Sequence, residues 1–320
     1  MIARSTFLAG SAGALAAAGS RAAFAASNKL VVGYVPSTLF APVFVAAERG
    51  YFKEAGFDAD LSPIVAGQDA MALAATGRLD LVAAALSAAF YNAVARGLGV
   101  RFVASTAYQP AHDHPTALMM REDLWQAGNR TLQSLRGRKI GWIGGAGAIS
   151  AYYVARILRP AGLSLNDIIP ENISNPDQAV ALERKAIDAV FTSSPFTERF
   201  AHDKLARTIG YPPAGISGSG ILFGPNLTGN VGLAHAAMAA CRKAAADIAG
   251  DGYYAPDALA AYAKYTKQPV DIIKAAPRYT IYPDLRVDEA TVEDAQREFM
   301  SEGILAYKTP LSEVVLTARY

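Results

Sequence analysis

The sequence is poor in the residue types that build covalent or metal-held structures. Cys241 is the only cysteine among 320 residues, which excludes an internal disulfide and a cysteine cluster for a metal. Cys241 lies far from the end of the N-terminal leader and no cysteine stands at that point, so we expect no lipid anchor there. The formal net charge of +2 favours neither a nucleic acid nor an acidic membrane surface as a partner. Beyond the N-terminus, no segment reaches the roughly 18–20 uninterrupted apolar residues of a membrane span.

The N-terminal residues 1–25 have the composition of a cleaved signal peptide. Arg4 lies near the start, a stretch rich in apolar residues, glycine and alanine follows from Phe7 to Gly19, and Ala23-Phe24-Ala25 forms an Ala-x-Ala cleavage site. Because Ser5 stands where a twin-arginine signal would have its second arginine, both the Sec and the Tat route remain open. We therefore expect a periplasmic protein.

The remaining chain alternates between strand-like and helix-like segments, which is typical of the α/β class. From Leu233 onward the pattern is almost entirely helical, so this tail must pack on a core built by earlier residues. Just under 300 residues are too many for one ordinary core and suit two lobes. The predicted strands are 30–35, 57–63, 79–83, 100–106, 116–120, 139–143, 168–172, 189–192 and 205–210.

One local pattern occurs twice: a strand, a turn of small residues and a helix. The first copy covers residues 30–50 and the second covers residues 139–158. A turn at the carboxyl end of a strand that leads into a helix presents free backbone N–H groups and the positive end of the helix dipole. Two such copies predict two α/β lobes with a ligand between them.

Three ordered sets of residues carry a resemblance to a known family. They are Gly33-Tyr34-Val35-Pro36, then the run from Ala46 to Phe57, and then Gly77-Arg78-Leu79-Asp80-Leu81. The sequence resembles the periplasmic solute-binding proteins for nitrate, sulfonate, taurine and thiamine-precursor pyrimidines. Further matches extend the resemblance over nearly the whole mature chain, namely Leu135 to Gly141, Ala161-Gly162-Leu163, Asp167-Ile168, Lys185 to Ala189 and Lys308-Thr309-Pro310.

The resemblance implies a type II periplasmic-binding clamshell, in which each lobe is a mixed, mostly parallel sheet flanked by helices. Lobe 1 would comprise residues 28–114 plus 216–320, with the helical tail, and lobe 2 residues 115–215. The implied protein is a monomer that captures a small oxyanion or organic solute and delivers it to an ABC permease with its ATPase subunit. No cofactor and no nucleic acid are implied.

Candidate ligand-binding residues lie where strands end and helices begin. Hydroxyls and free N–H groups meet at such points, and the resemblance indicates the same loops. The resemblance adds Gln68, at the start of a helix, as a further position that often faces the ligand in the family, and three aromatic side chains complete the set. The candidates are Ser37, Thr38, Leu39, Phe40, Gln68, Ser87, Ala88, Tyr108, Gly147, Ile149, Ser150, Ser193, Ser194 and Phe196.

The sequence departs from the family pattern at two places. Sulfonate-binding relatives commonly have a tryptophan and an acidic residue where this chain has Ser193 and Ser194, so a larger ligand such as a pyrimidine or an aromatic acid remains an alternative. Lys185 replaces the usual glycine of the stretch that ends at Ala189. Asp80 and Asp188 occupy corresponding places beside strands, where we expect carboxylates that satisfy loops rather than catalytic groups.

The histidines give little support for a metal site or an enzyme. His112 and His114 would share one face of an extended strand, but two histidines are too few for a metal site, and we expect a hinge or rim role. A serine hydrolase would need Ser87, Ser150 or Ser194 within reach of one of these two histidines. We therefore expect no enzyme and no metal, while a sensor or a periplasmic enzyme on the same fold remains an alternative.

Overall fold

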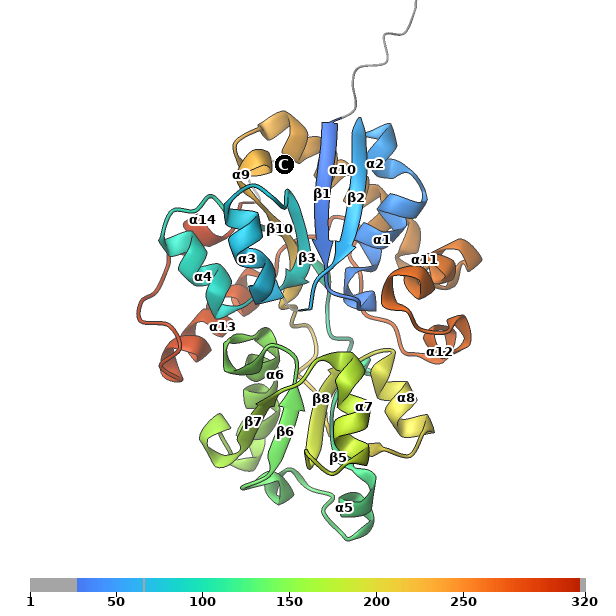
Figure 1. The fold of residues 1–320 in the computed structure, drawn as a ribbon, viewed down its shortest axis with the longest axis vertical. Coiled ribbons are helices and arrows are strands. Elements are labelled where there is room, and N and C mark those ends of the chain that lie inside the picture. The colour runs from blue at the N-terminus through green and yellow to red at the C-terminus, as the bar shows by residue number, and fades with distance from the viewer. Residues whose placement is uncertain (1–27, 66, 317–320) are drawn as a thin grey trace, which may run out of the picture.

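The computed structural model describes residues 28–65 and 67–316 and shows two lobes stacked along the long axis of the molecule (Figure 1). Each lobe contains one five-stranded sheet flanked by helices. This arrangement confirms the predicted α/β clamshell. The predicted signal peptide, residues 1–25, lies outside the described residues. Among the helices described, none combines the length and the apolar character that a membrane crossing requires.

The sheet of lobe 1 has the strand order β2-β1-β3-β10-β4. β1 pairs in parallel with β2 and β3, whereas β10 pairs antiparallel with both β3 and β4. Four strands therefore run in one direction and β10 runs against them. The strands are β1 (Asn28–Tyr34), β2 (Phe57–Pro63), β3 (Leu81–Ala85), β4 (Arg101–Ala107) and β10 (Ser219–Phe223).

The sheet of lobe 2 repeats this plan with the order β7-β6-β8-β5-β9. β6 pairs in parallel with β7 and β8, and β5 pairs antiparallel with β8 and β9. In each lobe the antiparallel strand is the first strand after the chain has entered that lobe from the other one. The strands are β5 (Thr116–Arg121), β6 (Lys139–Trp142), β7 (Ile169–Asn172), β8 (Ala189–Ser193) and β9 (Ala206–Gly210).

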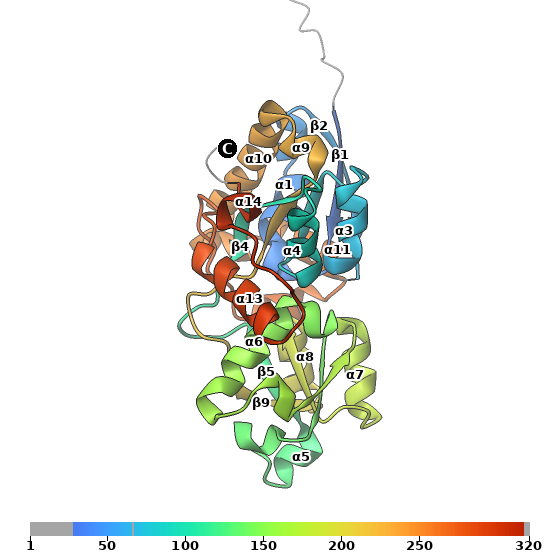
Figure 2. The same ribbon diagram turned by 90° about the vertical axis from the view of Figure 1, so that its left-hand side faces the viewer.

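Helices follow most strands and cover both faces of each sheet (Figures 1 and 2). In lobe 1 they are α1 (Ala41–Glu48), α2 (Tyr51–Glu54), α3 (Gly67–Ala75), α4 (Ala88–Ala95), α9 (Pro225–Thr228), α10 (Val231–Ile248), α11 (Pro256–Thr266), α12 (Val270–Ala275) and α14 (Leu311–Val314). In lobe 2 they are α5 (Glu122–Gln126), α6 (Ile149–Leu158), α7 (Asn175–Glu183) and α8 (Phe196–His202). Short 3-10 helices occur at 38–40, 132–135, 145–147, 159–161, 165–167 and 250–254.

Strand β10 is the main element that the sequence pattern does not predict. Its residues Ser219 to Phe223 are all buried, and the strand lies between β3 and β4. Glycine at position 220 lowers the β-strand propensity of this segment. The packing nevertheless requires glycine there, because a Cβ atom would lie 2.0 Å from the carbonyl oxygen of Ala104. Glycine is thus present because the neighbouring backbone approaches too closely for any side chain.

Asp80 and Asp188, the two carboxylates expected to be structural, make equivalent hydrogen bonds in the two lobes. Asp80 accepts a hydrogen bond from the amide of Val31 at 2.7 Å, and Asp188 accepts one from the amide of Lys139 at 3.1 Å. Each aspartate thereby holds a strand that leads towards the cleft.

Lys185, at the position where the sequence comparison expects glycine, has a φ of 56°. Glycine is favoured in this left-handed conformation.

Two crossing segments, residues 108–115 and 211–218, connect the lobes. They are hydrogen-bonded to each other, since the amide of Gln109 donates to the carbonyl of Ile216 at 3.0 Å and the amide of Gly215 donates to the carbonyl of Gln109 at 2.8 Å. The predicted lobe boundaries, after residues 114 and 215, fall within these segments. We keep those boundaries as a proposal for where the lobes divide.

Helix α13 (Glu289–Ser301) lies across the seam between the lobes (Figure 2). It packs on α4 of lobe 1 and on α6 of lobe 2. One buried apolar cluster runs through this region and includes Tyr91 of α4, Tyr152 of α6 and Phe299 of α13. The C-terminal helices α10 and α11 pack on lobe 1, whereas α12 also contacts α8 of lobe 2.

Candidate functional site

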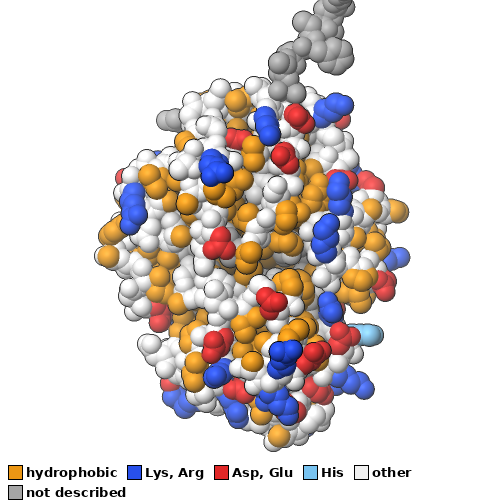
Figure 3. Space-filling view, viewed as in Figure 1, with side chains coloured by type: hydrophobic (Ala, Val, Ile, Leu, Met, Phe, Trp, Pro, Cys, Tyr) orange, Lys and Arg blue, Asp and Glu red, His pale blue; other side chains and the backbone are white. Residues whose placement is uncertain are grey.

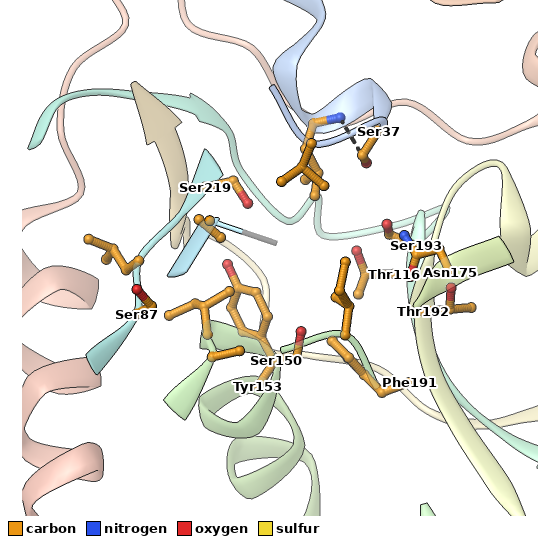
Figure 4. A pocket seen from close by; sticks show the side chains of 18 of the residues that line it. Ser37, Ser87, Thr116, Ser150, Tyr153, Asn175, Phe191, Thr192, Ser193 and Ser219 are labelled. Carbon is orange, nitrogen blue, oxygen red and sulfur yellow. Dashed lines mark hydrogen bonds between the residues drawn. The ribbon is translucent and has the colours of Figure 1, made fainter. Parts of the chain in front are cut away.

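A cavity lies between the two lobes where the carboxyl ends of β1, β3, β6 and β8 meet the starts of α3, α4, α6 and α7 (Figure 4). It contains about 730 Å³ of space that no atom fills, part of it open to solvent. Its lining residues are Val35, Ser37, Leu39, Phe40, Gly67, Gln68, Ala85, Leu86, Ser87, Gln109, Thr116, Ile143, Ala148, Ile149, Ser150, Tyr153, Asn175, Phe191, Thr192, Ser193 and Ser219.

Two helices begin at the cavity from opposite lobes. α4 begins after Ser87, whose Oγ accepts a hydrogen bond from the amide of Phe90 at 3.3 Å. α6 begins after Ala148, which has no side-chain oxygen to accept a bond from the first turn. The first amides of a helix have no partner within the helix, so these two starts offer N–H groups and positive dipole ends to a ligand.

The lobes touch each other on both sides of the cavity. On one side the amide of Ile149 donates to the carbonyl of Leu86 at 3.1 Å, and Ser87 and Ala148 form a backbone bridge. On another side the hydroxyl of Thr38 donates to the carbonyl of Ser194 at 3.4 Å. The structure therefore shows the lobes in contact around the cavity.

Several polar atoms at the cavity have hydrogen-bonding capacity left over. Gln109 and Thr192 are each 3 % exposed, and among the described residues neither Gln109 Oε1 nor Thr192 Oγ1 has a partner. Tyr153 Oη accepts a hydrogen bond from the amide of Gly218 at 2.6 Å, which leaves its own proton for an acceptor. Burial raises the pKa of Tyr153 well above its ordinary value, so this hydroxyl keeps its proton.

No residue that lines the cavity within the described part of the chain carries a formal charge. One candidate residue outside the lining contacts a carboxyl group: Glu198 Oε1 of α8 accepts a hydrogen bond from Ser194 Oγ at 3.0 Å. Its Oε2 is buried and has no partner among the described residues. Burial raises the pKa of Glu198 above its ordinary value.

The cavity brings together many of the predicted ligand-binding residues. Those that line it are Ser37, Leu39, Phe40, Gln68, Ser87, Ile149, Ser150 and Ser193. The remaining candidates do not line it: Thr38, Ala88, Tyr108, Gly147, Ser194 and Phe196. That any of these residues contacts a ligand stays a prediction.

Each candidate outside the lining is engaged elsewhere. The hydroxyls of Thr38 and Ser194 form the contacts described above, and the hydroxyl of Tyr108 donates to the carbonyl of Arg286 at 2.6 Å. The ring of Phe196 belongs to an apolar cluster of lobe 2. Ala88 and Gly147 face each other across the seam, because a Cβ at Gly147 would lie 3.5 Å from the Cβ of Ala88.

The sequence interpretation missed several polar residues at the cavity. Gln109 and Thr116 come from a crossing segment and the strand after it, Asn175 begins α7, and Ser219 begins the unpredicted β10. The sequence could have identified two of the missed residues, Tyr153 and Thr192, from their spacing to predicted site residues. Tyr153 lies one helical turn after Ser150 and so shares its face of α6, and Thr192 directly precedes Ser193.

The histidine pair gives no site in the described residues. No group of three or more histidine, cysteine or acidic side chains close enough to hold a metal occurs among them. The ring of His114 stacks on Tyr211, with ring centroids 4.3 Å apart, so it joins the two crossing segments. Ser87 and Ser150 line the cavity, whereas neither His112 nor His114 does.

Comparison with protein families gives a match over more than half of the chain. The family model described as NMT1/THI5 like matches residues 37–203. This range begins at the first cavity serine and ends after α8, so it includes most of the lining. No curated protein sequence matched the chain significantly.

Solved structures share the fold at low sequence identity. The alkanesulfonate-binding protein SsuA from Xanthomonas axonopodis pv. citri, bound to MOPS, has a TM-score of 0.71 and 17% identity, covering 92% of this chain and 100% of its own. The periplasmic nitrate-binding protein NrtA from Synechocystis PCC 6803 has a TM-score of 0.68 and 11% identity, covering 90% and 86%. A mutant of the desulfurization enzyme DSZB in complex with biphenyl-2-sulfinic acid has a TM-score of 0.62 and 14% identity, covering 91% and 97%.

Proposed function

Because the chain belongs to the NMT1/THI5-like family, we propose that it is the extracytoplasmic substrate-binding component of an ABC transporter. It captures a small oxyanion or organic solute, in the sulfonate, taurine and nitrate class, and delivers it to a permease. The observation that carries this proposal is the cavity between the lobes, at which helices from both lobes begin. In α/β folds such a crevice at the carboxyl ends of strands is where ligands bind.

The proposed mechanism is closure of the two lobes over the solute. Lobe 1 binds it first through Ser37, Gln68 and Ser87, and lobe 2 then adds Ser150 and Ser193. The ligand shifts the population towards the closed form because only that form satisfies groups from both lobes at once. The crossing segments are the place where the chain would bend. Closure brings both lobes into one joint surface for the permease and its ATPase subunit.

The lining also supports the alternative of a pyrimidine or an aromatic acid. Phe40 and Phe191 from opposite lobes offer apolar walls to a ring. On the face shown in Figure 3, hydrophobic side chains lie on both sides of the seam between the lobes. A ligand with an apolar body would gain more from this site than a bare inorganic anion.

The test is a thermal-shift screen of the purified protein followed by calorimetric titration. The panel contains nitrate, taurine, alkanesulfonates, aromatic carboxylates and sulfonates, and pyrimidines. A ligand at about 100 times its dissociation constant adds roughly 2.7 kcal/mol of stability. If no member of the panel raises the melting temperature of folded, ligand-free protein, the proposal fails for this solute class.

Two serine variants then test the location of the site. Ser87→Ala and Ser150→Ala should each weaken binding of an ionised ligand by roughly 1.5–3 kcal/mol, the worth of a hydrogen bond to a charged group. Ser164→Ala is the matched control, since Ser164 also begins a helix with a capping side chain but lies outside the cavity. Unchanged affinity in both cavity variants would show that the ligand binds elsewhere.

A further inference from the structure

Polar groups lie at several places around the cavity, and two sets of them lie on opposite sides. Figure 4 shows Ser87 on one side of the cavity and Thr192 and Asn175 on the other. The lining also includes apolar side chains from both lobes, among them Leu39 and Phe191. The cavity therefore presents two polar ends together with apolar surface.

The first end offers hydrogen-bond donors. Tyr153 Oη already accepts from the amide of Gly218, so its proton is free to go to a ligand oxygen. Ser87 and Ser150 mark the starts of α4 and α6 beside it, where amides of the first turns lack intrahelical partners. Donors and dipole ends without a cationic side chain suit a group with a single negative charge.

The second end offers an acceptor. Gln109 Nε2 donates to Thr116 Oγ1 at 3.0 Å, and Thr116 Oγ1 lies 2.9 Å from Tyr279 Oη. Thr116 Oγ1 is thus the acceptor of the hydrogen bond from the Gln109 amide nitrogen, and its contact with Tyr279 can have either direction. The carbonyl oxygen of the Gln109 amide is buried and has no partner among the described residues.

A buried carbonyl oxygen without a donor is costly to the protein. Buried polar groups in native structures are nearly always hydrogen-bonded, and leaving one unsatisfied costs the full desolvation of that group. The Thr192 hydroxyl of the neighbouring strand β8 also lacks a partner among the described residues. A ligand that carries an N–H or O–H group would satisfy Gln109 Oε1.

We infer that the ligand is an organic acid with one negative charge whose apolar body carries a hydrogen-bond donor at the end opposite the acid group. This inference rests on the proposed solute-binding function and narrows its ligand class. The acid group lies at Tyr153 and the starts of α4 and α6. The donor, a hydroxyl or an amino group, lies at Gln109 Oε1. An inorganic anion such as nitrate fills only the first end.

The experiment compares ligands that differ only in the donor. The purified protein is titrated calorimetrically with 4-hydroxybenzenesulfonate and toluene-4-sulfonate, with 4-hydroxybenzoate and 4-methylbenzoate, and with nitrate. Hydroxyl and methyl groups have similar size, so each pair isolates the hydrogen bond. In at least one pair the hydroxyl compound should bind about tenfold tighter or more, because its methyl partner leaves Gln109 Oε1 unsatisfied. Nitrate should bind more weakly than either member.

Two variants assign the preference to Gln109. Gln109→Leu should remove the difference within the preferred pair, and its circular dichroism spectrum and thermal unfolding show whether the variant is folded. Thr106→Val is the matched control: Thr106 Oγ1 is equally buried and without a partner among the described residues, but it does not line the cavity. That variant should keep the full preference.

The outcomes separate the inference from the function on which it rests. Equal binding of the hydroxyl and methyl compounds, or nitrate binding as tightly as the organic acids, overturns the inference and leaves a solute-binding protein. A preference that survives in Gln109→Leu overturns the assignment to this residue. No binding by any of these compounds overturns the inference and counts against the proposed solute class as well.

Discussion

The guanidinium of Arg156 in lobe 2 lies 2.8 Å from the carboxylate of Asp294 in α13. Tyr152 of the same lobe 2 helix donates a hydrogen bond to that carboxylate at 3.0 Å. Burial alone would raise the pKa of Asp294, but hydrogen bonds from Arg297 and Tyr152 and the charge of Arg156 hold it below its ordinary value. The carboxylate is thus ionised and joins the second lobe to the helix that crosses the seam.

Asp294→Asn should loosen this junction. The change keeps the shape of the side chain and removes its charge, so we expect the free energy of unfolding to fall by about 0.5–1 kcal/mol, as for partly exposed ion pairs. Because the pair spans the seam, small-angle scattering of the ligand-free variant should also show a larger radius of gyration.

Glu293→Gln is the control for this prediction. Glu293 lies on the same helix, but its partners Arg297 and Lys308 both belong to the C-terminal tail. It should leave the scattering curve unchanged. Identical curves for Asp294→Asn and the native protein would show that the ion pair does not hold the lobes together.

Glu198 should make stability depend on pH. Its pKa is raised by burial in the folded protein, so its contribution is most favourable below the ordinary glutamate pKa and is lost as the pH rises through the folded value. Tyr253, Tyr254 and Tyr279 also interact with this carboxyl group, and each would oppose its negative charge only when itself ionised. Urea unfolding of the native protein at a series of pH values measures this slope.

Glu198→Gln should flatten the slope, because an amide does not titrate, and should make the variant more stable than the native protein at neutral and alkaline pH. The exposed Glu313→Gln serves as the control and should follow the native curve. A Glu198→Gln curve parallel to the native one would mean that Glu198 does not change its pKa on folding.

Lys185→Gly should stabilise the protein. Lys185 has a φ of 56°, and this left-handed conformation costs a residue with a side chain about 1–2 kcal/mol relative to glycine. The substitution also removes an exposed ion pair with Asp123, which is worth little. We expect a net gain of about 1 kcal/mol in the free energy of unfolding.

Lys185→Ala separates the two effects, since alanine loses the ion pair but keeps the backbone strain. It should be no more stable than the native protein. A glycine variant that is no more stable than the alanine variant would show that the strain is relieved by neighbouring residues.

Gly220→Ala should destabilise lobe 1 by about 3 kcal/mol, at the upper end of the usual cost of overpacking. A Cβ atom would lie 2.0 Å from the Ala104 oxygen and 2.3 Å from the ring of Phe102, in the middle of the sheet. Thermal unfolding measures the loss. Gly232→Ala in α10 is the control with the opposite expected sign, because its Cβ would meet nothing closer than 3.5 Å and alanine favours a helix.

Much of the fold and part of the site were predictable from local sequence patterns. The alternation of strands and helices, the repeated strand-turn-helix unit and the family resemblance together predicted two α/β lobes. They also predicted cavity residues such as Ser37, Ser87 and Ser150, because these lie directly where a strand ends and a helix begins. Such positions face a cleft in any lobe of this kind, whatever the packing around them.

Other features depend on contacts between distant residues, and no local pattern reveals those. β10 is a strand because it fits between β3 and β4, which overrides the weak local preference of a segment with glycine at position 220. Thr38 and Ser194 carry hydroxyls suited to a ligand, but the packing directs the Thr38 hydroxyl to the backbone carbonyl of Ser194 and the Ser194 hydroxyl to Glu198.

The sequence by itself thus determined the fold class, the two lobes and the loops from which the cavity is built, since short-range periodicity and turn chemistry encode them. Only the tertiary structure decided which side chains of those loops line the cavity and which polar atoms remain without a partner. It also placed Gln109, from a crossing segment, in that lining. These properties depend on how two lobes from separate parts of the chain meet, and that geometry is absent from any local stretch of residues.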